Sequence, residues 1–124
     1  MGVIVQELLV RGDRGAKRLP VVFDSGSSRS LVRSSVAVEL ATPRRLLVPR
    51  EFVVADGDRV VCELFCELAV ELGGREVGIE AFLVENLPVP LIFGALDMEA
   101  YRIKLDPARR RLDLSEFTGY LLAL

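Results

Sequence analysis

A carboxylate and three small residues come directly after an apolar run, in the segment Val21–Ser27, VVFDSGS. The residues before Asp24 favour a strand, so the carboxylate stands at the end of a buried strand and is partly desolvated. Gly26 allows a sharp turn and a close approach of the backbone, and the hydroxyl of Ser25 can hold the loop in place. Asp, Ser and Gly are equally favoured in ordinary turns, so this segment alone leaves an active site and a simple turn both open.

The elements that must position Asp24 are strands. An apolar run from Val3 to Val10 ends at Gly12–Gly15, which has the composition of a turn. A second strand is expected from about Lys17 to Phe23, leading directly to Asp24. A short helix should follow the step Ser30–Val32. Its expected N-cap is Ser34 or Ser35, and its apolar surface is expected from Val36, Val38 and Leu40.

The middle of the chain predicts two hairpins. Asp56 and Gly57 stand between the β-branched runs 52–54 and 60–61, and Asp-Gly at such a place favours a type I′ turn. A long alternating strand then runs to Leu72 and meets a second turn at Gly73–Gly74. Its expected buried face carries Cys62, Leu64, Cys66, Leu68, Val70 and Leu72.

The chain has two cysteines, Cys62 and Cys66, four residues apart in that strand. Extended residues at this spacing are about 13 Å apart, which is too far for a disulfide. The chain contains no histidine that could complete a metal site with them. We therefore expect buried free thiols in a reducing compartment, and no metal.

The last third of the chain repeats the plan of the first. Leu91–Phe93 is a short apolar strand, Gly94 ends it, and a helical stretch of one or two turns follows, just as Val21–Phe23 leads to Asp24 and a helix. The two segments are candidates for one repeated unit. A final hairpin is expected around the turn at Asp106–Pro107.

Length and composition indicate a single domain, residues 1–124, because 51% of the 124 residues are hydrophobic. The net charge of -2 gives no footprint for nucleic acid, and the run Arg109–Arg111 is read as a solvated hairpin. We expect no signal peptide and no membrane span, hence a cytoplasmic protein. The uncharged tail Phe117–Leu124 should dock on this domain or on a partner.

The order of these pieces resembles that of the retropepsin-like aspartic proteases, which include the retroviral enzymes and their cellular relatives. Members carry an apolar pair, often Phe, then Asp-Thr/Ser-Gly-Ala/Ser, matched here by Val22–Ser27. A flap hairpin about thirty residues later is matched by Val54–Val60, and an apolar strand that ends in Gly before a short helix is matched by Leu91–Asp97. The resemblance covers roughly residues 19–114. It implies an all-β, closed barrel-like domain with one or two short helices, which forms one half of a C2 dimer.

The resemblance also implies an aspartic endopeptidase without a cofactor. Two copies of Asp24, one from each chain of a homodimer, would activate one water and share a proton. Activity should then decline as that proton is lost at higher pH. Ser25, Gly26 and Ser27 would support the active-site loop, and Gly94 would belong to the second loop. The flap residues would be Ala55, Asp56, Gly57 and Asp58.

The implied substrate is an extended, hydrophobic peptide or protein segment. Its contacts would come from Val54 and Ala55 beneath the flap, and from Pro90 and Ile92 near the second loop, although Ile92 is equally well read as a core residue. Ser28 and Ala95 stand where retroviral members have a supporting Asp and Arg, so the apolar chain ends are expected to help form the dimer. Two alternatives stay open: a non-catalytic dimeric module of this fold for peptide binding or assembly, and a generic monomeric β domain.

Overall fold

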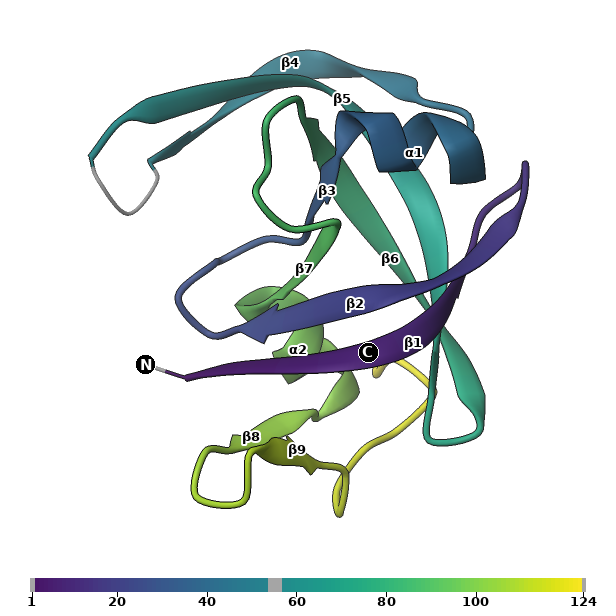
Figure 1. Ribbon diagram of the computed structural model, residues 1–124, viewed down its shortest axis with the longest axis vertical. Helices are drawn as coiled ribbons and strands as arrows, with labels where there is room; N and C mark the ends of the chain where they lie inside the picture. The colour runs from purple at the N-terminus through teal and green to yellow at the C-terminus, as the bar shows by residue number, and fades with distance from the viewer. Residues whose placement is uncertain (1, 54–56, 124) are drawn as a thin grey trace.

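The fold is seen in a computed structural model that describes residues 2–53 and 57–123. Nine strands and two short helices make up this part of the chain (Figure 1). In order, they are β1 (Val3–Arg11), β2 (Ala16–Asp24), β3 (Leu31–Arg33), α1 (Ser34–Leu40), β4 (Arg44–Val53), β5 (Arg59–Leu72), β6 (Arg75–Val84), β7 (Leu91–Gly94), α2 (Ala95–Tyr101), β8 (Lys104–Asp106) and β9 (Arg111–Asp113). The expected all-β class with two short helices is confirmed.

Six of the strands close into a barrel. The large sheet has the order β1-β2-β7-β3-β6-β5-β4, and an additional pairing of β1 with β5 closes the ring of six strands. Val10 lies opposite Val70 at this closure. Closure removes most free strand edges, which would otherwise invite pairing with other chains. Strand β4 stays outside the ring and pairs with β5, so the β4–β5 hairpin arches over one side of the barrel (Figure 1).

The repeated segments lie side by side at the centre of the sheet. Strands β2 and β7 run parallel, with Val22 opposite Ile92, Phe23 opposite Phe93 and Asp24 opposite Gly94. The rings of Phe23 and Phe93 stack with centroids 4.9 Å apart inside the main core, and both side chains are fully buried. This packing fixes both strand ends, so the repeat seen in the sequence positions the two loops that follow it.

The interior face of β5 is the one that alternation predicts. Cys62, Cys66, Leu68, Val70 and Leu72 are buried, and Leu64 is partly buried against the core. Both cysteines are free thiols. Burial, together with the nearby carboxylate of Asp13, raises the pKa of Cys66 to about 11. The turn after β5 has positive φ at both Gly73 and Gly74, as the Gly-Gly pair indicates.

A second apolar cluster lies outside the barrel core, under the β4–β5 hairpin. Its buried members are Leu31, Cys62, Phe82 and Leu87, and its partly buried members are Leu46, Phe52, Val60, Phe65, Val84, Val89 and Ile92. The cluster joins the inner side of the hairpin to β3, β6 and β7. We call it the groove cluster.

Helix α1 differs from the expectation in two respects. Its N-cap is Arg33, in extended conformation and without a side-chain cap bond, so neither Ser34 nor Ser35 caps it. Strand β3 ends at Arg33 and α1 begins at the next residue, so Ser34 is already helical and cannot be the N-cap. Ala37 and Leu40 are buried and Val36 packs against the core, whereas Val38 points outward and is 45% exposed. A step of about 100° per residue cannot place Val36, Val38 and Leu40 on one face.

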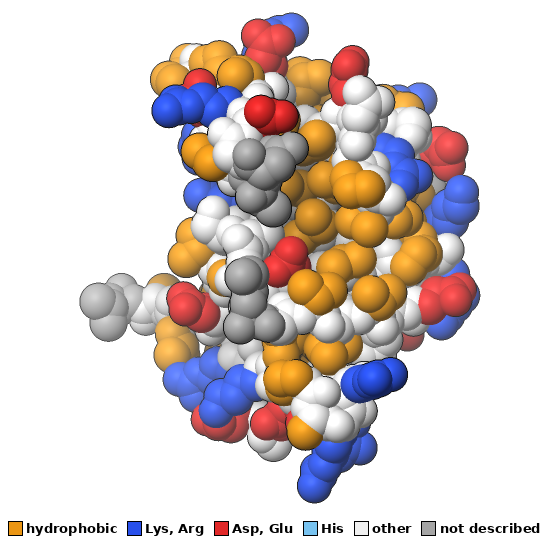
Figure 2. Space-filling model, turned by 60° about the vertical axis from the view of Figure 1, so that its left-hand side comes forward, with side chains coloured by type: hydrophobic (Ala, Val, Ile, Leu, Met, Phe, Trp, Pro, Cys, Tyr) orange, Lys and Arg blue, Asp and Glu red, His pale blue; other side chains and the backbone are white. Residues whose placement is uncertain are grey.

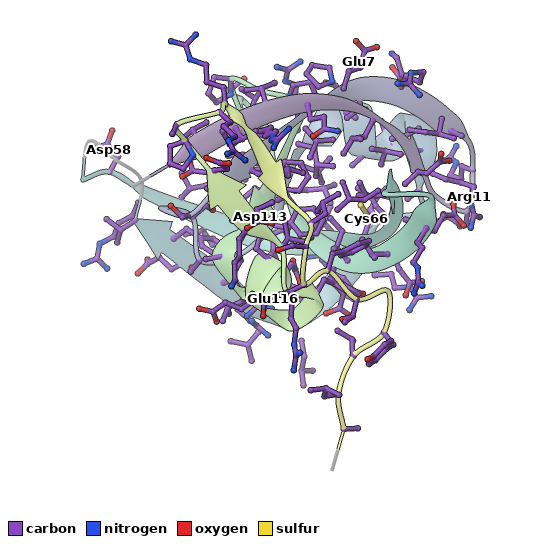
Figure 3. The ribbon with its side chains drawn as sticks, turned by 90° about the horizontal axis from the view of Figure 1, so that it is seen from below. Glu7, Arg11, Asp58, Cys66, Asp113 and Glu116 are labelled. Carbon is purple, nitrogen blue, oxygen red and sulfur yellow. The ribbon has the colours of Figure 1, made fainter. Side chains whose placement is uncertain are left out.

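The C-terminal part packs against the barrel core through Leu105, Leu112 and Leu114. Strands β8 and β9 form the expected hairpin, and Phe117 packs against the core. Beyond it, Tyr120, Leu121 and Leu122 are each more than half exposed. Figure 3 shows this tail running away from the body of the molecule. Neither described helix, at seven residues each, could cross a membrane.

Candidate active site

Asp24 stands at the end of β2, between two neighbouring strands. It lies opposite Val3 of β1 on one side and opposite Gly94 of β7 on the other. The backbone N–H of Gly26 donates to Asp24 Oδ1 at 2.8 Å, and the N–H of Ser27 donates to the carbonyl of Asp24 at 3.2 Å. No other described residue donates to the carboxylate. One oxygen is therefore fixed by the loop while the other is available for chemistry.

Ser25 is tied to the beginning of its own chain. Its Oγ accepts a hydrogen bond from the N–H of Gly2 at 3.0 Å and donates to the carbonyl of Gly2 at 3.3 Å. Its backbone N–H also donates to that carbonyl at 3.2 Å. The hydroxyl thus holds the loop in place, as expected for a serine there, and its partner within the described chain is Gly2, directly before β1. Bracing across a dimer axis stays a proposal.

The two loops expected from the sequence are locked together through backbone bonds. The N–H of Ala95 donates to the carbonyl of Ser27 at 2.7 Å, and the N–H of Leu96 donates to the carbonyl of Ser28 at 3.1 Å. Ser28 and Ala95 are the positions at which the supporting Asp and Arg of retroviral members were expected to be missing. Main-chain bonds connect the two loops at these positions.

Gly94 is required at the crossing of the loops. A Cβ at this position would lie 2.3 Å from the carbonyl carbon of Arg29 and 2.4 Å from its oxygen. Such contacts are far inside van der Waals distance and involve backbone, which cannot move away easily. The structure thus brings Asp24, Ser25, Gly26, Ser27 and Gly94 into one loop pair.

A buried polar link below the loops was not predicted. Ser30 is fully buried, accepts a hydrogen bond from the N–H of Gly94 at 3.0 Å and donates to Asp97 Oδ2 at 2.5 Å. Asp97 lies in the first turn of α2, and no motif in the sequence pointed to a link between it and Ser30. Nothing in the local sequence relates two residues that are 67 positions apart, so only the parallel pairing of β2 and β7 reveals the link.

The hairpin expected around Asp56–Gly57 is formed by β4, which ends at Val53, and β5, which begins at Arg59. Phe52 lies opposite Val60, Val53 opposite Arg59, and Gly57 has φ of +90°. Figure 3 shows Asp58 at the far end of this hairpin. Three residues proposed for the flap or the substrate site, namely Val54, Ala55 and Asp56, lie outside the described residues. The β4–β5 hairpin and the loop after β2 lie on the same side of the molecule (Figure 1).

The remaining candidate contacts lie along the groove cluster. Ile92 is partly buried in that cluster and not in the barrel core. It pairs with Val22 and with Leu31, and directly paired residues present their side chains on the same face of a sheet. Pro90 is partly buried, and its carbonyl accepts a hydrogen bond from the N–H of Arg33 at 3.0 Å. An apolar floor therefore begins two residues before Asp24.

Apolar side chains gather on the face that carries the β4–β5 hairpin and the loop after β2 (Figure 2). A hollow of about 470 Å³ lies at the base of the β4–β5 hairpin, between Arg45, Val60 and Glu85, and does not include Asp24. We place the candidate site at Asp24, because two loops that are joined by backbone hydrogen bonds converge there. Among the described residues, no group of three or more His, Cys, Asp or Glu could hold a metal ion.

The fold can now be compared with known proteins. No protein-family profile matches the chain, and no curated protein matches it. Among solved structures, it is similar to the retroviral protease-like domain of Ddi1 from Leishmania major, with a TM-score of 0.57 and 13% sequence identity. The match covers 99% of this chain and 95% of that one. The retropepsin-like fold expected from the sequence is confirmed.

Proposed function

We propose that the chain is an aspartic endopeptidase that works as a homodimer. The observation that carries the proposal is the position of Asp24: it ends a buried strand, opposite Gly94, in a loop pair held by backbone bonds and beside an apolar floor. A carboxylate held in this way, with one oxygen uncommitted, suits general acid–base catalysis. A domain that served only as a scaffold would not need an uncommitted carboxylate there.

One chain supplies one such carboxylate, so a second copy must supply the other. In a C2 dimer the two Asp24 residues would meet on the axis, and two neighbouring carboxylates hold one shared proton. The ionised Asp24 takes a proton from water as the water oxygen attacks the carbonyl carbon of the peptide. The protonated Asp24 donates its proton to the carbonyl oxygen. Collapse of the tetrahedral intermediate then breaks the C–N bond, and the leaving nitrogen takes up a proton.

The groove cluster supports a peptide as the substrate. It lies between the β4–β5 hairpin, which is the proposed flap, and strands β3, β6 and β7. It includes Phe52 and Val60 of the hairpin, and Ile92, which pairs with Val22 two residues before Asp24. Apolar walls with a few polar groups at one end are typical of binding sites for extended ligands. Closure of the hairpin would exclude water from the dyad, which strengthens its electrostatics.

A second candidate function is a dimeric binding module without catalysis. The specific observation in its favour is that Ser25 is already bonded to Gly2 of its own chain, so a catalytic dimer has to be compatible with that contact or replace it. Such a module would bind peptides along the same floor and leave them intact.

The test is cleavage of a peptide library by the wild type and by Asp24→Asn, between about pH 4 and about pH 8, with cleavage followed by mass spectrometry. The wild type should cleave, and the variant should lose at least about 1,000-fold in kcat/KM while keeping its fold and mass. Activity should fall toward the upper end of the pH range as the shared proton is lost.

Either of two results would reject the proposal. Cleavage that survives in Asp24→Asn would place the chemistry elsewhere. A folded dimer that binds peptides but never cleaves them would favour the binding module.

A further inference from the structure

We propose that Arg29 and Arg50 form a subsite for a carboxylate side chain of the peptide, so that the groove prefers substrates with Glu or Asp about four residues from the cleaved bond. The inference rests on the proposed function only in assuming that a peptide lies along the groove. It concerns which peptide is selected, which the catalytic aspartate does not determine.

Both arginines lie over one aromatic ring. The guanidinium carbon of Arg29 is 5.2 Å from the centroid of the Phe82 ring, and that of Arg50 is 5.6 Å from it. Phe82 is 2% exposed and is also contacted by Phe52 of the flap hairpin, with ring centroids 5.5 Å apart. Contact with a ring face holds a guanidinium in place while its N–H groups remain able to donate at its edges.

These N–H groups have no carboxylate partner within the described part of the chain. Neither Arg29 nor Arg50 has a side-chain hydrogen bond or an ion pair there, whereas Arg11 and Arg59 are each paired with a glutamate. A guanidinium carries five N–H donors and binds a carboxylate with two parallel bonds. The pair therefore offers unused donors on a fixed support, which a negatively charged side chain could occupy.

The support lies at the far end of the apolar floor. Across the sheet, Val22 pairs with Ile92, Ile92 with Leu31, and Leu31 with Phe82. Three strand spacings amount to about 14 Å, which an extended peptide covers in about four residues. A substrate whose scissile bond lies at Asp24 would thus bring its fourth residue close to the two arginines.

Acidic side chains near Arg29 weaken its attraction for a substrate carboxylate. Glu67 and Glu80 lie opposite each other on β5 and β6, and together with Asp97 they line a hollow of about 270 Å³ that also includes Arg29. Their charges compete with a substrate carboxylate for Arg29. Removing one of them should therefore strengthen the preference for an acidic residue, an effect that a purely structural role of Arg29 would not produce.

The experiment compares two peptides that differ only at the fourth residue from the cleaved bond, Glu in one and Gln in the other. For the wild type, we expect kcat/KM to be about tenfold higher for the Glu peptide, mostly through KM, since the contact is remote from the reacting atoms. The preference should disappear in Arg29→Gln/Arg50→Gln and increase in Glu80→Gln. Arg14→Gln is the matched control, because Arg14 lies on the turn between β1 and β2, and it should keep the wild-type ratio.

Folding and catalysis are tested separately from selectivity. Arg50→Gln alone changes an exposed side chain, so the melting temperature should stay unchanged. The ratio of kcat/KM for the Glu peptide to that for the Gln peptide should fall at least by about half. Binding of both peptides to the Asp24→Asn variant, measured by fluorescence anisotropy, should show the same preference for the Glu peptide without cleavage. Equal kcat/KM values for the two peptides, or equal binding, would overturn the subsite while leaving the protease intact. A Glu preference in binding that the double variant loses, in a protein that never cleaves, would support the subsite and overturn the proposed function.

Discussion

Ser30 has the most demanding environment of any polar side chain in the described structure, since it is the one buried polar residue there. Its hydroxyl satisfies the N–H of Gly94 and the carboxylate of Asp97 at the same time. It thereby connects the strand after the first loop to both the end of β7 and the first turn of α2. An unsatisfied buried donor costs more than a lost exposed hydrogen bond, because no water replaces the partner.

Ser30→Ala should therefore reduce the free energy of unfolding by about 1–3 kcal/mol, as measured by urea denaturation. Ser28→Ala is the control, because Ser28 is exposed and connects to the second loop through its carbonyl, and it should change stability by less than about 0.5 kcal/mol. Equal free energies of unfolding for the two variants would mean that the hydrogen bonds of Ser30 do not stabilise the fold.

At the scale of single residues, the sequence predicts the ends of strands better than the contacts between them. Asp24 and Gly94 stand out because each ends a short apolar run, and residue type and order are enough to select them. The partners of Ser30, and the ring that supports Arg29 and Arg50, depend on which strands become neighbours. Such contacts join residues tens of positions apart, so no local pattern carries them.

At the scale of elements, the β strands follow from alternation and turn residues, whereas helix α1 does not follow from its serines. The capping expectation failed because β3 continues directly into the helix and places an extended Arg33 at the N-cap. The segment that follows the C-terminal end of α1 is held instead by the turn between β1 and β2. Asp13, between β1 and β2, accepts hydrogen bonds from the N–H of Thr42 at 2.7 Å and from its hydroxyl at 2.6 Å.

The contact between Asp13 and Thr42 makes the stability of the fold depend on pH. The hydrogen bonds from Thr42, its hydroxyl first, lower the pKa of Asp13 in the folded chain. A lowered carboxyl pKa contributes stability that is present above the unfolded value and is lost as the pH falls through the folded value. Thr42→Val removes the hydroxyl donor. Its urea midpoint should thus lie below that of the wild type at about pH 7, and the gap should narrow below about pH 4.

The same measurement on Thr118→Val, whose hydroxyl donates to a carbonyl and not to a carboxylate, provides the comparison. Any difference between this variant and the wild type should not vary with pH. A gap for Thr42→Val that stays constant from neutral to acidic pH would exclude the Asp13 contact as its cause.

At the scale of the whole molecule, closure of the barrel leaves one face that a single chain does not cover. Val3 and Val5 are 55% and 59% exposed, and they lie opposite Asp24 and Val22, so they share the face of the candidate dyad. Leu96, 50% exposed, follows directly after the second loop. Exposed apolar groups next to a catalytic carboxylate are expected where a second copy has to bring its own carboxylate.

This arrangement predicts that association and catalysis fail together. Val5→Glu/Leu96→Glu places like charges near the axis and should weaken dimerisation by about 100-fold, measured as molecular mass against concentration by analytical ultracentrifugation. Cleavage should fall in parallel and recover at high protein concentration, because dimers form again by mass action. Leu47→Glu is the control: Leu47 is fully exposed on β4, outside the barrel, and its charge should leave mass and activity unchanged. A wild type that cleaves peptides while its mass remains that of one chain would exclude a dyad made from two copies of Asp24.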